Sequence, residues 1–273
     1  MKTDKWKYYN HAVISDTAPH EEADTESMRD EKVFWAKWHN AIFARWTSDF
    51  DCGVETEWWY IIKDTPIDLE SMDSKVRKHI RQSLKKLRVE KIDPKKYAVA
   101  LSKVHADACS RYENYTGQIS PEDFTDDNDG CVDYWGAFCL ETGEMAGYMK
   151  CHRYEDYVNT DVSKFSPFHL NLRPSDALHY TVINYYINDG GYRYISSGSR
   201  NISHVTNVQD YKIKTFGFRK AYCKLHIEYN PKVRTLVKLM YPFRGILKKL
   251  DFIGIVHNVN AVMKMEEILR RKK

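Results

Sequence analysis

Apolar and polar positions follow two different periods along this chain, and its last third contains both. Every second residue from Cys223 to Tyr229 is apolar, with polar residues between, which is the period-2 pattern of a half-buried strand. A short helix is predicted just before it, over Val208–Phe216. Gly217 ends that helix, because glycine adopts the left-handed conformation without a Cβ clash and turns the chain into the strand.

The middle of the chain predicts a hairpin followed by a crossover. Strands are predicted over Cys131–Leu140 and Met145–Arg153, antiparallel because only the short turn ETGE joins them. Residues 157–164 show no decisive pattern. Phe168–Leu172 is predicted as a short strand, the sequence RPSD then opens a helix, and Tyr192–Ser197 is the next strand.

The first third predicts two strands and two helices. Asn40–Thr47 and Glu55–Lys63 read as strands, and the turn-prone sequence SDFDCG between them predicts a hairpin. A helix is predicted from about Asp73, and a second one from Asp93-Pro94. The first helix has apolar residues at helical spacing on one face: Val76, Ile80, Leu84 and Leu87.

This order of elements predicts an α+β protein with a mixed, mostly antiparallel central sheet and flanking helices. Three parts are expected: residues 1–95 with the hairpin and a basic helix, a core over 96–230, and a basic helical tail over 231–273.

Composition and charge set the class of protein. The chain of 273 residues is 42% hydrophobic and 14% aromatic, which indicates a globular protein rather than a disordered one. Its net charge of +4 is small but uneven, with ten Lys and Arg against two acids from Lys75 to Lys96. Such segregation indicates either local recognition of anions or a solvated basic face.

Several classes of site and location are not expected. The six cysteines have neither a CxxC pair nor metal-type spacing, so we predict no metal site. The N-terminal sequence has no apolar signal region, and no window approaches the ~18 apolar residues of a spanning helix. A cytoplasmic location is therefore predicted.

Two segments carry a resemblance to a known family. The sequence TFGFRKAYCKLHIEYNP, a helix ending in "GF" before a strand, resembles the carboxy-terminal signature of GNAT-type acyltransferases. The segment KVRKHIRQSLKKLRV looks like the "R-x-x-IR-x-x-x-K-x-x-V" segment of Fem-type peptidyltransferases and related N-acyltransferases of polysaccharide gene clusters. The resemblance spans residues 57–230. It implies a GNAT-like core in 96–230 and a partial GNAT-like half in 1–95.

The resemblance implies a donor site at the start of the crossover helix. In GNAT enzymes a Q/R-x-x-G-x-G/A loop there holds the pyrophosphate of acetyl-CoA or another acyl-CoA. Leu172, Arg173 and Ser175 would belong to this cofactor-binding loop, and Arg173 matches its first position. Asp176 and Leu178 stand where the glycines should be, and an ordinary helix start would give the same sequence. Fem-type enzymes use aminoacyl-tRNA instead, and do not need this loop.

A second set of candidates follows the next strand. Ser199, Arg200 and Asn201 lie just past the strand end, where the strands of GNAT proteins splay, and they are assigned to the cofactor. Fem-type enzymes carry an aromatic–lysine pair in the helix that follows, which Tyr211 and Lys212 match. The lysine would neutralise a tRNA phosphate or a developing oxyanion, or else be a solvated helix lysine.

The substrate-binding candidates lie elsewhere. Arg77 and Arg81 are one helical turn apart, so their guanidinium groups can hold a phosphate or sugar carboxylate together, or form a solvated surface. Trp135 and Tyr148 would wall an acceptor cleft or fill the core.

A general base is also sought near the central hairpin. Asp133 and Glu141, close to the ends of its first strand, are the candidates for accepting the proton of the acceptor amine.

The tail combines charge with hydrophobicity. It holds six Lys and Arg and no acid between Lys232 and Lys249, interleaved with apolar residues. Residues 232–256 therefore predict an amphipathic helix, suited to peripheral contact with the inner face of a membrane or to packing on its own domain or across a homodimer.

Together these patterns predict an N-acyltransferase without a metal. It would move an acetyl or aminoacyl group to an amine on an amino sugar or cell-envelope polysaccharide precursor. The alternative is a non-catalytic GNAT-like module that binds tRNA or another polyanion through residues 75–96.

Overall fold

The computed structural model describes residues 5–110, 119–125, 130–201, 207–252 and 254–271. The chain forms two compact units. The terminal unit, which contains both chain ends, is made of Met1–Tyr60, Ser199–Thr206 and Lys220–Lys273, and the central unit is made of Ile61–Gly198 and Asn207–Arg219. The predicted boundaries near residues 95 and 230 do not coincide with these units, because the terminal unit gathers three segments that are distant in sequence.

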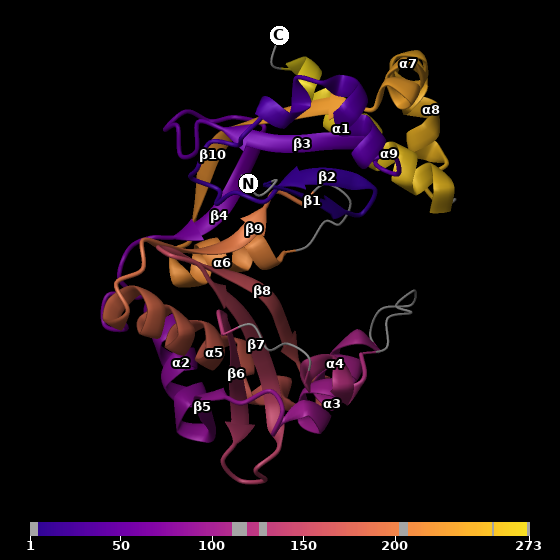
Figure 1. The fold of residues 1–273 in the computed structure, drawn as a ribbon. Helices are drawn as coiled ribbons and strands as arrows, with labels where there is room; N and C mark the ends of the chain where they lie inside the picture. The colour runs from indigo at the N-terminus through magenta and orange to yellow at the C-terminus, as the bar shows by residue number, and fades with distance from the viewer. Residues whose placement is uncertain (1–4, 111–118, 126–129, 202–206, 253, 272–273) are drawn as a thin grey trace. The chain divides into compact units, whose positions relative to one another are not determined.

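The central unit is built on five strands in the order β9-β8-β7-β6-β5 (Figure 1). They are β5 (Leu87–Ile92), β6 (Val132–Cys139), β7 (Met145–Arg153), β8 (Tyr157–Phe165) and β9 (Tyr194–Ser199). Neighbours from β5 to β8 are antiparallel, so the predicted β6–β7 hairpin is confirmed, and β9 is parallel to β8.

Helices cover both faces of this sheet. They are α2 (Ser74–Lys86), α3 (Ala98–Cys109), α4 (Pro121–Thr125), α5 (Pro174–Ile183), continued by the π-helix η3 (Asn184–Asp189), and α6 (Val208–Phe216). In Figure 1, α2 and α5 lie on one side of the strands and α3 and α4 on the other. Leu101 and Val104 of α3 pack with Tyr134 and Tyr148, forming the core beneath α3.

The crossover in the central unit runs from β8 through α5 to β9. The prediction of a strand at Phe168–Leu172 was wrong, because Pro167 begins a 3₁₀ helix, η2 (Pro167–Leu172), and proline fixes φ at a helical value and lacks an N–H for strand pairing. The strand that feeds the crossover is β8, over the stretch where the sequence pattern was undecided.

The terminal unit has its own strands, in the order β1-β2-β3-β10-β4. They are β1 (Trp6–Tyr9), β2 (Ala12–Ser15), β3 (Phe43–Ser48), β4 (Trp58–Lys63, which continues into the central unit) and β10 (Arg219–Tyr229). The predicted β3–β4 hairpin was wrong, because β10, from the far end of the chain, lies between those two strands and pairs antiparallel with β3.

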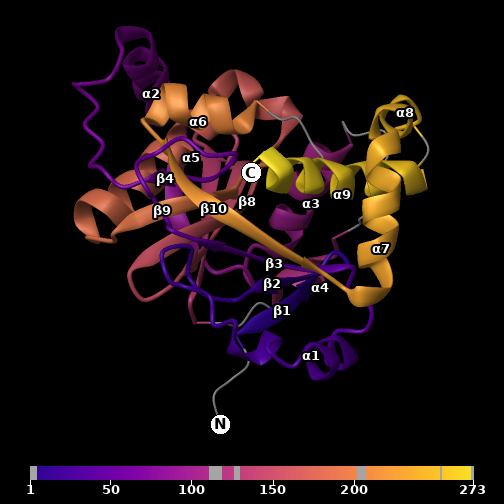
Figure 2. The same cartoon turned by 90° about the horizontal axis from the view of Figure 1, so that it is seen from above.

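The helices of the terminal unit are α1 (Glu31–Lys37), α7 (Pro231–Met240), α8 (Arg244–Lys249) and α9 (Gly254–Arg271), with short 3₁₀ turns η1 (Glu26–Met28) and η4 (Tyr241–Phe243). Figure 2 shows the long strand β10 running directly into α7. Val237 of α7 and Met263 of α9 pack with Phe43 and Tyr229, so the C-terminal helices complete a core of this unit. Both units are α+β with mostly antiparallel strands, as predicted.

Among the helices of the described residues, none has the length and apolar character needed to cross a membrane.

Candidate functional site

The parallel strands β8 and β9 separate after a short paired stretch. Their last paired residues are Asn159 and Ser196, although both strands continue further. Beyond that point, Lys212 of α6 lies with its Nζ 2.5 Å from Ser197 Oγ and 3.5 Å from Thr160 Oγ1. The ammonium group is therefore held by the first residue of each strand beyond the pairing of β8 with β9, at the point where the two strands splay.

The local sequence explains why Lys212 points inward. Lys212 and Phe216 are one turn apart on α6 and both are buried, so this face of the helix lies against the unit. Gly217, with φ of +67°, closes the helix in the left-handed conformation, as predicted. Only 3% of Lys212 is exposed, and this burial lowers the pKa of its ammonium group to about 8.

Tyr211 lies beside Lys212 and contacts the start of α5. Its hydroxyl donates to Asp176 Oδ1 over 2.5 Å and accepts from Ser175 Oγ over 3.1 Å. Burial is the main reason that the pKa of Tyr211 is raised well above its ordinary value, and the bond to Asp176 raises it further. Tyr211 therefore stays protonated and can act as a hydrogen-bond donor.

His179, one turn along α5, completes this group. Its Nδ1 donates to the carbonyl of Ser175 over 2.8 Å, so the other ring nitrogen, Nε2, carries the lone pair. Nε2 is buried and has no hydrogen-bond partner within the described structure. Burial lowers the pKa of His179 to about 3, and its ring stacks on Phe216 with centroids 5.2 Å apart. The imidazole is therefore neutral at physiological pH.

These side chains line a pocket of about 400 Å³ in the central unit, which we call the Lys212 pocket. Its lining residues are Ala108, Ser163, Lys164, Phe165, Leu170, Ser175, His179, Val208, Tyr211 and Lys212. The structure thus brings together three of the residues proposed from sequence, Ser175, Tyr211 and Lys212. Sequence reasoning missed His179. Its spacing of four residues from Ser175 on one helix was the available signal.

The start of α5 differs from an open anion site. Pro174 has no N–H, and the N–H groups of Asp176 and Ala177 both donate to the carbonyl of Arg173. Arg173 itself has φ of +58° and an exposed side chain 3.7 Å from the carboxylate of Asp176. Leu172 is half-buried and packs in the core with α5. This helix start offers an arginine, but few backbone donors, to a phosphate.

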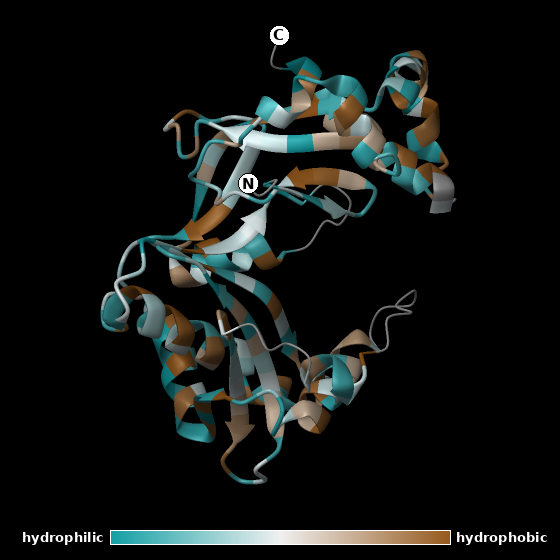
Figure 3. Ribbon diagram, viewed as in Figure 1, coloured by the Kyte–Doolittle hydropathy of each residue, from teal (hydrophilic) through white to brown (hydrophobic). Residues whose placement is uncertain are grey.

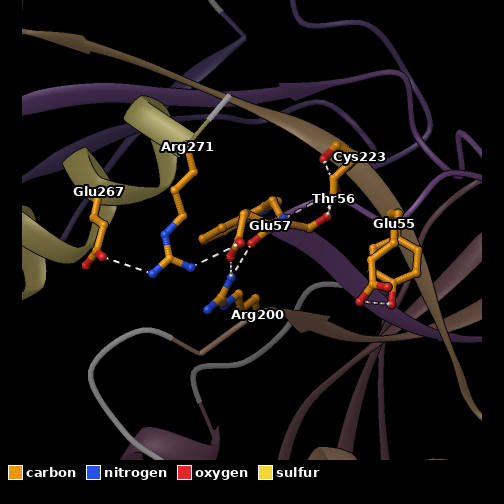
Figure 4. Close-up of polar contacts among 9 residues, drawn as sticks. Glu55, Thr56, Glu57, Arg200, Cys223, Glu267 and Arg271 are labelled. Atoms are coloured by element: carbon orange, nitrogen blue, oxygen red, sulfur yellow. Dashed lines mark hydrogen bonds and ion pairs between the residues drawn. The ribbon is translucent and has the colours of Figure 1, made fainter. Parts of the chain in front are cut away.

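The residues proposed after β9 belong to the terminal unit. Arg200 forms an ion pair with Glu57 over 3.0 Å, and Arg271 of α9 contacts the same carboxylate over 3.2 Å (Figure 4). The bond from Arg200 is the main reason that the pKa of Glu57 is lowered. Ser199 is half-buried at the end of β9 and Asn201 is exposed. The rest of this predicted loop, residues 202–206, lies outside the described residues.

The two arginines of α2 do converge, and on a protein carboxylate. Both Arg77 and Arg81 form ion pairs with Glu70, and Arg77 also donates to the Glu70 carbonyl over 2.6 Å. Arg81 and Glu70 are largely exposed, so an incoming anion can compete with this carboxylate.

The four candidates near the β6–β7 hairpin do not line the Lys212 pocket. Asp133 is buried and bound to Lys91 over 2.6 Å, to Arg153 over 3.0 Å and to the Tyr186 hydroxyl over 2.7 Å. The remaining three lie in the core or at the surface: Trp135 donates to Tyr186, Tyr148 bonds His105 over 2.8 Å, and Glu141 is exposed in the turn after β6.

No group of three or more His, Cys, Asp or Glu side chains with metal-binding geometry occurs among the described residues.

Comparison with known proteins identifies the fold. No protein-family model and no curated protein matches the chain. FemX matches with a TM-score of 0.59 at 12% identity over 82% of each chain. The C-terminal domain (DUF2156) of a putative lysylphosphatidylglycerol synthetase from Agrobacterium fabrum matches with a TM-score of 0.53 at 11% identity, over 81% of this chain and 79% of that one. L-PGS from Bacillus licheniformis matches with a TM-score of 0.51 at 12% identity, over 83% and 80%.

The chain therefore shares its fold with FemX, L-PGS and the DUF2156 domain, and the Fem-type resemblance seen in its sequence is confirmed at the level of the fold.

Proposed function

We propose that this protein transfers an acyl or aminoacyl group from an activated donor to an amine, and that the Lys212 pocket is where the transfer occurs. The observation that carries the proposal is the buried ammonium group of Lys212 at the splay of β8 and β9. A positive charge held in a dry site can stabilise negative charge that develops in a transition state, because the low dielectric strengthens the interaction.

The reaction needs little covalent chemistry from the protein. The amine nitrogen attacks the carbonyl carbon of the donor, a C–N bond forms, and the carbonyl oxygen becomes an oxyanion beside Lys212. The bond from that carbon to the donor's sulfur or oxygen then breaks, and the leaving atom takes up the proton that the amine releases. Lys212 acts as a charged hydrogen-bond donor to the oxyanion, and Ser197 positions its ammonium group over 2.5 Å.

Tyr211 and His179 have supporting roles in this proposal. Tyr211 stays protonated and donates its one O–H to Asp176, so it fixes the wall of the pocket at the start of α5, and its oxygen can accept a hydrogen bond from the substrate. His179 stays neutral and offers the lone pair of Nε2, so it can accept a hydrogen bond from an N–H or O–H group that enters after a small side-chain movement.

The donor is either an acyl-CoA, such as acetyl-CoA, or an aminoacyl-tRNA. The few free N–H groups at the start of α5 favour the second, since the pyrophosphate of CoA would rest mainly on Arg173. The fold shared with FemX and L-PGS is compatible with the second donor. We propose an amine on a glycan precursor of the cell envelope as the acceptor, and the cytoplasm as the place of the reaction.

The proposal is tested by transfer assays with purified protein. Radiolabelled acetyl-CoA and aminoacyl-tRNA are offered in separate reactions with a panel of amino sugars, and the labelled product is measured. We expect one donor to be used by the wild-type protein and by Lys214→Met, an exposed lysine on the same helix, but not by Lys212→Met. Equal transfer by Lys212→Met and wild type would rule out the Lys212 pocket.

A second candidate is a non-catalytic module that binds a polyanion such as tRNA. The observation that favours it is the exposed basic face of α2, which includes Lys75, Lys78, Arg81 and Lys85. Binding of tRNA that weakens steeply with salt, together with no transfer from any donor, would support this function over catalysis.

A further inference from the structure

The helical tail has two apolar stripes, and only one of them is covered. The inner stripe packs on the terminal unit, with Val233, Val237, Met240 and Leu247 joining the core formed by β3, β10 and α9. The outer stripe is exposed. Its members and their exposed fractions are Leu236 53%, Leu239 65%, Phe243 59%, Ile246 61% and Leu250 38%. The predicted packing of the tail on its own domain is therefore present, and a second hydrophobic face remains.

The outer stripe follows helical spacing. Its residues are separated by alternating steps of three and four along α7, η4 and the segment of α8, and this spacing puts Leu236 and Leu239 on one side of α7. At 100° per residue, that side of α7 lies about a quarter of a turn from the side of Val233, Val237 and Met240. Figure 3 shows hydrophobic and hydrophilic stretches alternating along the C-terminal helices. Phe252, which follows α8, is also exposed, at 82%.

The segment that carries the outer stripe is also positively charged. Lys232, Lys238, Arg244, Lys248 and Lys249 are all exposed. Within the described part of the chain, Lys238, Lys248 and Lys249 form no ion pair, whereas Arg234 of the same helix is bound to Glu31 and Glu228. No acid occurs between Lys232 and Lys249. The face formed by the outer stripe and these cations, which we call the α7–α8 face, is both apolar and uncompensated in charge.

We propose that the α7–α8 face lies on an anionic lipid surface. An amphipathic helix parallel to a bilayer buries its apolar side chains at the level of the headgroups, and the flanking lysines bind the negative headgroups. A second copy of the chain is a poorer partner, because a two-fold contact would bring the same set of cations together from both sides. This inference does not depend on the acyl-transfer proposal, because the α7–α8 face and the Lys212 pocket share no residue.

The test is sedimentation with vesicles, using the full-length protein. Vesicles of phosphatidylcholine alone are compared with vesicles containing phosphatidylglycerol, each at low and at high salt. We expect binding to the anionic vesicles at low salt and release as the salt screens the lysines. Equal binding to both vesicle types, or no binding to either, would overturn the proposal.

Two variants separate the hydrophobic and the electrostatic contributions to vesicle binding. Leu239→Glu with Ile246→Glu removes the outer stripe, and Lys238→Gln with Lys248→Gln and Lys249→Gln removes three cations. Each should weaken partitioning by about tenfold to a hundredfold. Val99→Glu, a substitution at a 74% exposed position of α3, is the matched control and should bind as wild type does. If the glutamate variant fails to fold, the glutamine variant still decides the question.

Light scattering after size-exclusion chromatography tests whether a second copy of the chain, instead of a lipid surface, covers the α7–α8 face. We expect a monomer for both the wild type and the Leu239→Glu, Ile246→Glu variant. A wild-type dimer that this variant converts to a monomer would make the α7–α8 face a self-association surface and would refute the lipid proposal.

Discussion

The ammonium group of Lys212 lies 2.5 Å from the hydroxyl of Ser197, the first residue of β9 that no longer pairs with β8. The contact joins a helix to the opening between two parallel strands and keeps a charge where little water can reach it. Burial of this kind destabilises the folded state, and such a cost is kept at positions where the charge serves a function.

Replacing Lys212 by methionine should separate stability from activity. Methionine fills similar space without a charge, and the pKa of Lys212 is lowered from 10.5 to about 8. We therefore expect the free energy of unfolding at pH 7 to rise by about 1 to 3 kcal/mol, while transfer falls by about a hundredfold to a thousandfold. Denaturant titration and the transfer assay measure the two effects, with Lys214→Met as the control. A variant that is less stable and fully active would contradict the proposed role.

The sign of the stability effect can be checked with pH. Between pH 8 and 10.5 the unfolded chain keeps a proton on Lys212 that the folded protein has lost, so burial of this residue destabilises the fold below pH 8 and ceases to do so as the pH rises. The stability gain of Lys212→Met should therefore disappear between about pH 8 and 10.5. A gain that is constant with pH would show that packing, not charge, is its cause.

The pH dependence of transfer should reveal the working form of Lys212. If the ammonium form stabilises the oxyanion, kcat/KM falls as the pH rises through about 8, because the proton is then lost. A rate that instead increases through that pH would mean that the neutral amine acts as a general base. Lys212→Met should lack this transition in either case.

His179 should make the protein sensitive to mild acid. Its pKa is about 3 in the folded state, against an ordinary value of 6.5, so the unfolded chain binds a proton that the folded protein does not. The free energy of unfolding should fall below about pH 6.5. The slope from this residue should approach about 1.4 kcal/mol per pH unit. Urea titrations at several pH values should give a shallower slope for His179→Phe than for His39→Phe, an exposed control.

Arg173 should be the main phosphate contact if CoA is the donor. Its exposed guanidinium group stands at a helix start where the N–H groups of Asp176 and Ala177 are already bonded to a carbonyl. Calorimetry should then show acetyl-CoA binding that Arg173→Glu weakens by about tenfold or more, since a charge-assisted bond contributes roughly 1.5 to 3 kcal/mol. No heat from wild-type protein at millimolar ligand would exclude CoA and leave aminoacyl-tRNA.

Arg77 and Arg81 should affect the substrate more than the fold. The side chains of Arg81 and Glu70 are largely exposed and that of Arg77 is partly exposed, and ion pairs at the surface contribute little to stability. Replacing both by alanine should change the melting temperature by only a few degrees and strongly reduce transfer to a negatively charged acceptor, while Lys78→Ala leaves transfer unchanged. A large drop in melting temperature with normal transfer would make the pair structural.

Local signals predicted part of this structure well. The helix over Val208–Phe216, its end at Gly217 and the strand that follows could be read from residues close together in sequence, and the structure has all three. The β3–β4 hairpin was misread for the opposite reason. The turn sequence between β3 and β4 is a local signal. The strand that separates them, β10, lies more than 150 residues later in the chain, so no residue near the turn indicates its position.

In the candidate site too, residues that local sequence signals identify differ from contacts that depend on distant parts of the chain. Tyr211 and Lys212 were proposed from a family resemblance, but a lysine in a short helix is normally solvated. Lys212 is buried because α6 packs over the splay of β8 and β9. These strands are separate elements in the sequence, so the sequence of the helix alone does not predict the burial. Asp133 was proposed as a general base, but in the structure its carboxylate is bound by two cations. These cations, Lys91 and Arg153, come from the strands on either side of β6, so the ion pairs could not be predicted from the residues next to Asp133 in the sequence.

The position of β10 between β3 and β4 also bears on how the protein is made. The first sixty residues of the terminal unit leave the ribosome long before β10, the last strand in the described part of the chain. Until then β3 and β4 present unpaired edges, which are prone to pair with other chains. The central unit has most of its residues in a continuous segment and can assemble meanwhile. A nascent chain that stalls before Arg219 would therefore carry a nearly complete central unit beside an open, aggregation-prone sheet.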